Sequence, residues 1–169
     1  MSNAEPNNAA AGTGLVLSRY RYLVTLTVLL LAVVFVGSDS FQAANSCGEV
    51  YRKDKTAVVG QTKLQLEVVK KSEDRQKGLS GRTCIGEGQG MLFVFEQPGY
   101  YRFWMNDMRF AIDMVWLDND KKVVTVHANV QPKTYPKTFS GDKPALYVLE
   151  IGAGQARAYG IYSGTLIKF

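Results

Sequence analysis

The chain has 169 residues, of which 46% are apolar and 21% are charged, and its formal net charge is +5 at pH 7. These values are ordinary for a globular protein, and they exclude both disorder over the whole chain and the need for a second domain. The basic residues are spread as pairs near expected strand ends instead of forming one tract, which argues against nucleic acid as a partner and favours solvated rims.

The N-terminal region predicts a membrane segment. Residues 1–14 are small and polar and are expected to form a disordered tail. Residues 22–37, YLVTLTVLLLAVVFVG, carry no charge and follow Arg19 and Arg21. Since a spanning helix needs about 20 apolar residues, residues 15–37 are interpreted as an uncleaved transmembrane anchor or as a signal peptide. Both interpretations export the rest of the chain, so the protein is expected to be membrane-anchored facing outside the cytoplasm, or secreted.

Export affects the interpretation of Cys47 and Cys84, which are the two cysteines of the chain. An even number of cysteines in an oxidising compartment favours a disulfide. It would close a loop of about 37 residues and stabilise the fold by roughly 3 to 4 kcal/mol. The alternatives are two unrelated thiols or a nucleophilic pair of Cys84 with His127. One His and two Cys are too few for a usual zinc site, so no metal and no cofactor are expected.

The exported part begins with residues 38–62, which are expected to form a linker that ends in an edge strand. Residues 63–70, KLQLEVVK, alternate between apolar and polar side chains. This alternation predicts a half-exposed strand, with the leucines on one face and Glu67 on the other. Ser72 is expected to cap a short helix that ends at Gly78.

The aromatic stretch 90–118 holds both Trp and half of the Phe, and it predicts the core of a β-sheet. Residues 91–95, 100–105 and 112–117 are the predicted strands. Gln97, Pro98 and Gly99 predict a hairpin between the first two of these strands.

The C-terminal part completes a mostly β pattern. A tight turn is expected to lead into a strand at 123–130, and a long proline-containing loop follows at 131–144, of the kind that often borders a site. A further strand is expected at 145–151, a helical turn at 154–160 and a closing strand at 165–169. The predicted fold is a compact, sandwich-like or barrel-like single domain, 63–169, with one or two short helices and one preceding hydrophobic helix.

Two acids are candidate site residues. The strand period places Asp113 on a face with Val115, and Glu150 on a face with Val148, so both are expected to be buried. A buried carboxylate needs a cation or backbone donors. The candidate cations are Arg82, Arg102 and Arg109. One interpretation is structural ion pairs; the other is a ligand cleft lined by Arg82, Asp113 and Glu150, in which the two acids are also candidates for a catalytic pair.

Trp104 is a further candidate, because it shares a strand face with Tyr100 and Arg102. If the opposite face, with Phe103, packs in the core, then Arg102 and Trp104 form an exposed aromatic and cationic surface suited to a sugar ring or a peptide. If not, Trp104 packs in the core. Trp116 is expected to be a core residue.

Several of these motifs occur together in a known family. GLSGR at 78–82, GMLFVF at 90–95, FWM at 103–105 and YVLEI at 147–151, with Ile112-Asp113 between the last two, resemble the domain of unknown function 192 family. The resemblance covers residues 63–169 and implies a compact, mostly β domain like a small sandwich. It implies no particular activity. The chain differs from the usual family pattern at Asn106, Asp107 and Ala111.

Three functional hypotheses follow. The first is a tethered or secreted β domain that binds an envelope glycan or a partner protein without catalysis. The second is a small hydrolase or lyase that uses Asp113 and Glu150 as acid and base, with Arg82 holding an anionic substrate. The third is a purely structural envelope protein.

Overall fold

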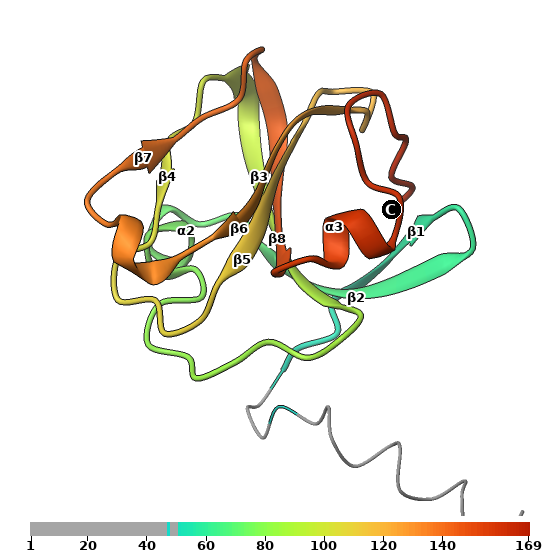
Figure 1. The fold of residues 1–169 in the computed structure, drawn as a ribbon. Coiled ribbons are helices and arrows are strands. Elements are labelled where there is room, and N and C mark those ends of the chain that lie inside the picture. Colours follow the sequence, from blue (N-terminus) through green and yellow to red (C-terminus); the bar gives the residue numbers. More distant parts are fainter. Residues whose placement is uncertain (1–46, 48–50) are drawn as a thin grey trace, which may run out of the picture. The chain divides into compact units, whose positions relative to one another are not determined.

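The computed structural model describes Cys47 and residues 51–169 (Figure 1). Within these residues a six-stranded sheet has the order β1-β2-β3-β8-β5-β6, and β4 and β7 form a two-stranded sheet. The strands are β1 Lys55–Val59, β2 Thr62–Val69, β3 Gln89–Gly99, β4 Phe103–Trp104, β5 Ile112–Leu117, β6 Val123–Val130, β7 Thr138–Phe139 and β8 Ala145–Gly152. The helices are α2 Ser72–Lys77, η1 Pro132–Thr134 and α3 Gln155–Ala158. The mostly β prediction is confirmed, but the sheet does not close into a barrel.

The predicted N-terminal elements, residues 1–14 and 15–37, lie outside the described residues. No helix in the described part of the chain is long and apolar enough to cross a membrane.

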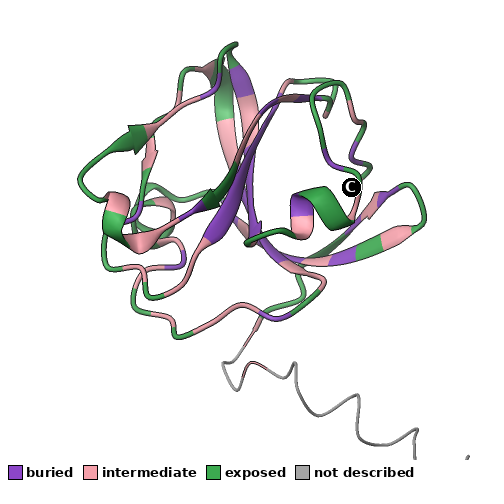
Figure 2. Ribbon diagram, in the orientation of Figure 1, coloured by how far each residue is buried: buried purple, intermediate pink, exposed green. Residues whose placement is uncertain are grey.

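The centre of the sheet is covered on both faces, which explains why all six residues of β5 are buried (Figure 2). Val115 and Leu117 belong to a hydrophobic cluster that includes Ala156 of α3. Met114 and Trp116 belong to a second cluster, against which side chains of β4 and β7 pack. Successive side chains of a strand point to opposite faces, so one continuous apolar strand can serve both clusters. Trp116 is a core residue, as predicted.

The predicted hairpin at Gln97, Pro98 and Gly99 is wrong. β3 continues through Gly99, and it pairs with β2 in parallel and with β8 in antiparallel orientation. β2 pairs with β3 up to Phe93 and β8 pairs with it over residues 90–94, so both hydrogen-bonding edges are occupied over most of the predicted strand 91–95 and the segment after Gly99 cannot pair there. The short strand β4 pairs with β7 instead.

Local signals at helix α2 are confirmed in part. The helix ends before Gly78, whose φ of 49° is in the region that glycine tolerates best. Ser72 is the first helical residue instead of the cap, and the capping residue Lys71 makes no side-chain hydrogen bond to the helix.

The expected closing strand at 165–169 is reduced to two isolated bridges, from Leu166 and Lys168.

Candidate functional site

Arg102, Trp104 and Glu150, three of the predicted ligand-binding residues, line one pocket of about 210 Å3 beside α2. The pocket also receives side chains from β3 and from the segment around β4. Its aromatic residues are Phe93, Phe95, Tyr101, Phe103 and Trp104, and its basic residues are Arg75, Lys77 and Arg102. The remaining predicted residues, Arg82 and Asp113, lie elsewhere.

Glu150 supplies the acidic group of the pocket. It stands on β8 between Met91 of β3 and Met114 of β5 in the sheet register, and 5% of the residue is exposed. Within the described part of the chain its carboxyl group has no hydrogen-bond or ion-pair partner. Burial raises the pKa of Glu150 from 4.5 to about 8. The group is therefore mostly protonated at neutral pH and can donate a hydrogen bond as well as accept one.

Aromatic contacts fix the wall of the pocket. Phe103 packs edge-on against Phe93, with ring centroids 4.8 Å apart, and against Trp116 at 5.7 Å. Phe95 and Tyr101 stack with their ring centroids 3.4 Å apart. These rings anchor the segment around β4 to the sheet, so the wall is held by packing and does not depend on a bound ligand.

The rim of the pocket carries exposed groups. Since Phe103 packs in the core, the neighbouring side chains point outward: Trp104 is 53% exposed and Arg102 is also exposed. Of the two arrangements considered for Trp104, the structure has the exposed one. Tyr100, which the sequence placed on the same face, is 64% exposed. A large exposed indole beside a pocket is typical of a binding site.

Asp113 and Glu150 do not face one another. Val115 and Leu117, on the face of Asp113, belong to one core cluster, whereas Val148, on the face of Glu150, belongs to the other. The two carboxyl groups therefore point to opposite faces of the sheet and cannot act on one substrate as an acid and base pair.

The role of Asp113 is structural. Its carboxylate is fully buried and accepts hydrogen bonds from the backbone N–H groups of Asn129 at 2.7 Å, Gly154 at 3.1 Å and Ala156 at 2.8 Å. Of the two kinds of partner expected for this acid, a cation or backbone donors, the structure has backbone donors. These bonds tie β5 to the end of β6 and to the beginning of α3.

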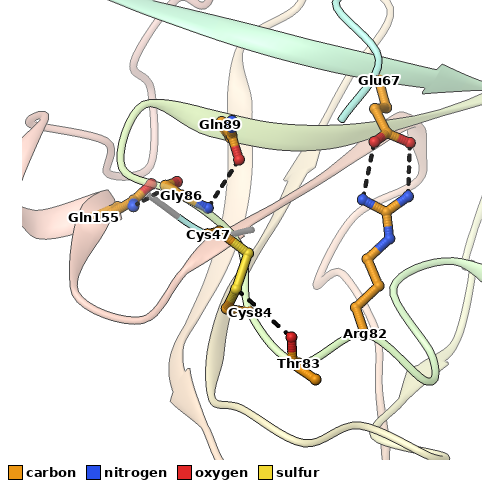
Figure 3. Close-up of a disulfide and its surroundings, with 8 residues drawn as sticks. All are labelled: Cys47, Glu67, Arg82, Thr83, Cys84, Gly86, Gln89 and Gln155. Carbon is orange, nitrogen blue, oxygen red and sulfur yellow. Dashed lines mark hydrogen bonds and ion pairs between the residues drawn. A yellow bond between two sulfur atoms is a disulfide. The ribbon is translucent and has the colours of Figure 1, made fainter. Parts of the chain in front are cut away.

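Arg82 pairs with a residue that the sequence reasoning missed. Its guanidinium donates two parallel hydrogen bonds to Glu67, at 2.9 and 2.8 Å (Figure 3). Glu67 is 3% exposed, whereas the alternation of β2 placed it on the polar face. The prediction that Arg82 pairs with Asp113 or Glu150 is therefore wrong. The bidentate geometry suits a structural link between β2 and the loop after α2.

A disulfide joins Cys47 to Cys84, with their Cα atoms 5.8 Å apart (Figure 3). The predicted pairing is confirmed, and the alternative of a nucleophilic Cys84 with His127 is wrong because the Cys84 sulfur is already bonded. His127 lies against Trp116 and Phe139, and its Nε2 is 2.9 Å from the carbonyl oxygen of Ser140.

Replacing both Cys47 and Cys84 by Ser is expected to lower the free energy of unfolding by about 3 kcal/mol, because the unfolded chain regains the entropy that the cross-link removes. Urea denaturation with and without a reductant measures this difference. The reductant should destabilise the wild type and leave the double variant unchanged. Equal stability of the reduced and oxidised wild type would contradict a stabilising role for this bond.

The described residues contain no group of three or more His, Cys, Asp or Glu side chains that could hold a metal ion. The side chains of the pocket beside α2 provide a buried protonated acid, an aromatic wall and a cationic rim.

The structure defines a small, mostly β domain with a pocket beside α2 that Arg102, Trp104 and Glu150 line. The chain belongs to the DUF192 family, described as "Uncharacterized ACR", whose family model matches residues 55–169. This agrees with the resemblance seen in its motifs. No curated protein matches the chain.

Two crystal structures are similar to this domain. A protein of unknown function from Novosphingobium aromaticivorans DSM 12444 is 29% identical with a TM-score of 0.64, and the match covers 68% of this chain and 84% of that one. A candidate transcription regulator from Sinorhizobium meliloti 1021 is 25% identical with a TM-score of 0.63, covering 67% of this chain and 89% of that one.

Proposed function

We propose that this protein is a binding module that acts outside the cytoplasm, anchored through residues 15–37 or secreted, and that it does not catalyse a reaction. The disulfide between Cys47 and Cys84 supports the location, since such bonds persist in oxidising compartments and are rare in the cytosol. The uncharged run at 22–37 supports the anchor.

The proposed ligand is a glycan of the cell envelope. The observation that carries this proposal is the pocket that collects Arg102, Trp104 and Glu150. Its volume of about 210 Å3 is below the range of about 300 to 1,000 Å3 that is usual for drug-sized ligands. A single sugar ring suits such a space. The exposed face of Trp104 offers a flat apolar surface for the ring, and the acid and the guanidinium offer hydrogen bonds to its oxygens.

A second candidate function is catalysis by Glu150. A carboxyl group with a raised pKa in a pocket has the property that a general acid needs. The hydrolase or lyase hypothesis with Asp113 as the partner is not supported, because Asp113 faces the other side of the sheet and is held by backbone donors. Non-catalytic binding is therefore the better-supported proposal.

The Trp104→Ala variant is expected to lose glycan binding, with affinity reduced roughly tenfold or more, because truncating an exposed aromatic anchor typically costs about 2 kcal/mol. A glycan array probed with labelled wild type and variant measures this loss. Tyr162→Ala is the matched control, since Tyr162 is 68% exposed and does not line the pocket. The same signals from the wild type and from Trp104→Ala would remove the binding proposal. A purely structural envelope protein would give no signal with any of the three.

A further inference from the structure

The pocket beside α2 carries positive charge that its own acid does not offset. Its lining contains Arg75, Lys77 and Arg102, and Glu150 is the one acidic side chain among the described residues that line it. Because burial raises the pKa of Glu150 to about 8, this group is mostly uncharged at neutral pH. The pocket then presents three positive charges and little negative charge, a field that attracts an anionic ligand.

Two of these three cations are available to a ligand. Arg75 is engaged, because its Nη1 donates to the carbonyl oxygens of Lys70 and Val94. Lys77 and Arg102 are exposed, and their side chains make no hydrogen bond or ion pair within residues 51–169. A ligand anion can therefore meet Lys77 and Arg102 without breaking an existing interaction.

The groups around Glu150 determine which hydrogen bonds its carboxyl group can make to a ligand. Its neighbours in the sheet, Met91 and Met114, do not titrate. Asp113 points to the opposite face. The ionisable side chains that share the pocket with Glu150 come from two elements: Arg75 and Lys77 from α2, and Tyr101 and Arg102 from the segment before β4. A protonated carboxyl group among these donors can donate a hydrogen bond to a ligand oxygen. This hydrogen bond is stronger when the ligand oxygen is charged than when it is neutral.

We propose that this pocket selects an acidic sugar, one with a carboxylate on its ring, over the neutral sugar of the same stereochemistry. The sugar ring packs against Trp104, the negative charge is met by Lys77 and Arg102, and the Glu150 carboxyl donates a hydrogen bond to a ligand oxygen. The inference rests on the proposed glycan-binding function and names the class of glycan.

The test compares methyl glucuronide with methyl glucoside, which differ at the carboxylate, in ligand-observed NMR titrations of the full-length protein. The wild type is expected to bind the glucuronide roughly tenfold more tightly at about pH 6. Arg102→Ala and Lys77→Ala are expected to reduce this preference. Arg109→Ala is the matched control, because Arg109 is exposed and does not line the pocket; it should keep the preference.

The pH dependence separates the role of Glu150 from that of the cations. Between about pH 6 and pH 9 the wild type is expected to lose roughly tenfold in affinity for the glucuronide, since the acid stops donating and begins to repel the ligand. Glu150→Gln keeps an N–H donor and no charge, so its affinity should stay constant over this range. A glucuronide affinity that falls equally in the wild type and in Glu150→Gln would overturn the role given to this side chain.

Other outcomes separate this inference from the proposed function. Equal affinity for the two sugars overturns the acidic preference and leaves sugar binding intact. A preference that survives both Arg102→Ala and Lys77→Ala overturns the assignment to this pocket. Failure to bind either sugar, together with a silent glycan array, removes the inference and the proposed function together. Binding of a peptide instead of a sugar removes the inference and the glycan ligand, and leaves the proposal of a binding module.

Discussion

Replacing Asp113 by Ala is expected to lower the free energy of unfolding by about 4 kcal/mol, because each buried donor left without its acceptor costs about 1 to 3 kcal/mol. The carboxylate is fully buried and accepts three backbone N–H groups, from Asn129, Gly154 and Ala156. Asp113 is fully buried, so water has little access to these donors when the carboxylate is removed. Urea denaturation followed by tryptophan fluorescence measures the loss.

Asp118 provides the matched control. Its carboxylate also accepts two backbone N–H groups, from Asp120 and Lys122, both at 2.9 Å, but it lies in the exposed turn between β5 and β6. Water can replace the side chain there, so Asp118→Ala should cost about 1 kcal/mol or less. If Asp113→Ala fails to fold, Asp113→Asn retains one acceptor oxygen and should show an intermediate loss. Equal effects at Asp113 and Asp118 would contradict the assigned role.

The sequence predicted that both Asp113 and Glu150 are buried, but not that they lie on opposite faces. The period of two within a strand assigns each acid to the face of its own neighbours. Which of those faces coincide depends on the register between β5 and β8, in which Met114 lies opposite Glu150. A shift of one residue would place the two acids on the same face. This pairing joins segments far apart in the chain, so no local pattern determines it.

Pairing between strands that are far apart in the chain also explains why the hairpin predicted at Gly99 does not form. The turn residues there favour a hairpin, but β2 and β8 occupy both edges of β3 over residues 90–93, where the partner strand of that hairpin would pair. A contact with a distant segment also explains the error at Glu67, which the alternation of side chains places on the polar face of β2. It is buried because Arg82 reaches it from the loop after α2, and because the backbone N–H of Arg52 also donates to it at 3.1 Å. The buried acid and the arginine of the GLSGR motif could be linked only through the structure.

The features that were predicted correctly are set by residues close together in the chain, or have few possible arrangements. The strand Ile112–Leu117 was predicted at its observed bounds, because five of its six residues are large and apolar, which suits a strand buried on both faces. Helix α2 ends at the predicted glycine. The disulfide was predictable because two cysteines allow a single intramolecular pairing. For the candidate site, the residues of the rim were predicted, whereas the pocket itself required the arrangement of α2, β3 and β4.

The second large effect is expected at Glu150, where the stability of the wild type should fall as pH rises from about 4.5 to about 8. The folded protein raises the pKa of this carboxyl from 4.5 to about 8, so between these values the native state binds a proton that the unfolded chain has released. Stability is therefore highest below the lower value and declines by up to about 1.4 kcal/mol per pH unit, for a total of about 5 kcal/mol.

Glu150→Gln isolates this contribution, because an amide of nearly the same shape does not ionise. At about pH 5 the variant and the wild type should have similar stability, and at about pH 9 the variant should be more stable by several kcal/mol. Urea midpoints and slopes measured across this range provide the comparison. Glu96→Gln is the control, since Glu96 is exposed near the end of β3 and its removal should matter little at any pH. Parallel curves for the wild type and Glu150→Gln would show that folding does not raise the pKa of Glu150. The carboxyl would then be charged at neutral pH and would not be the uncharged donor on which the selection of an acidic sugar depends.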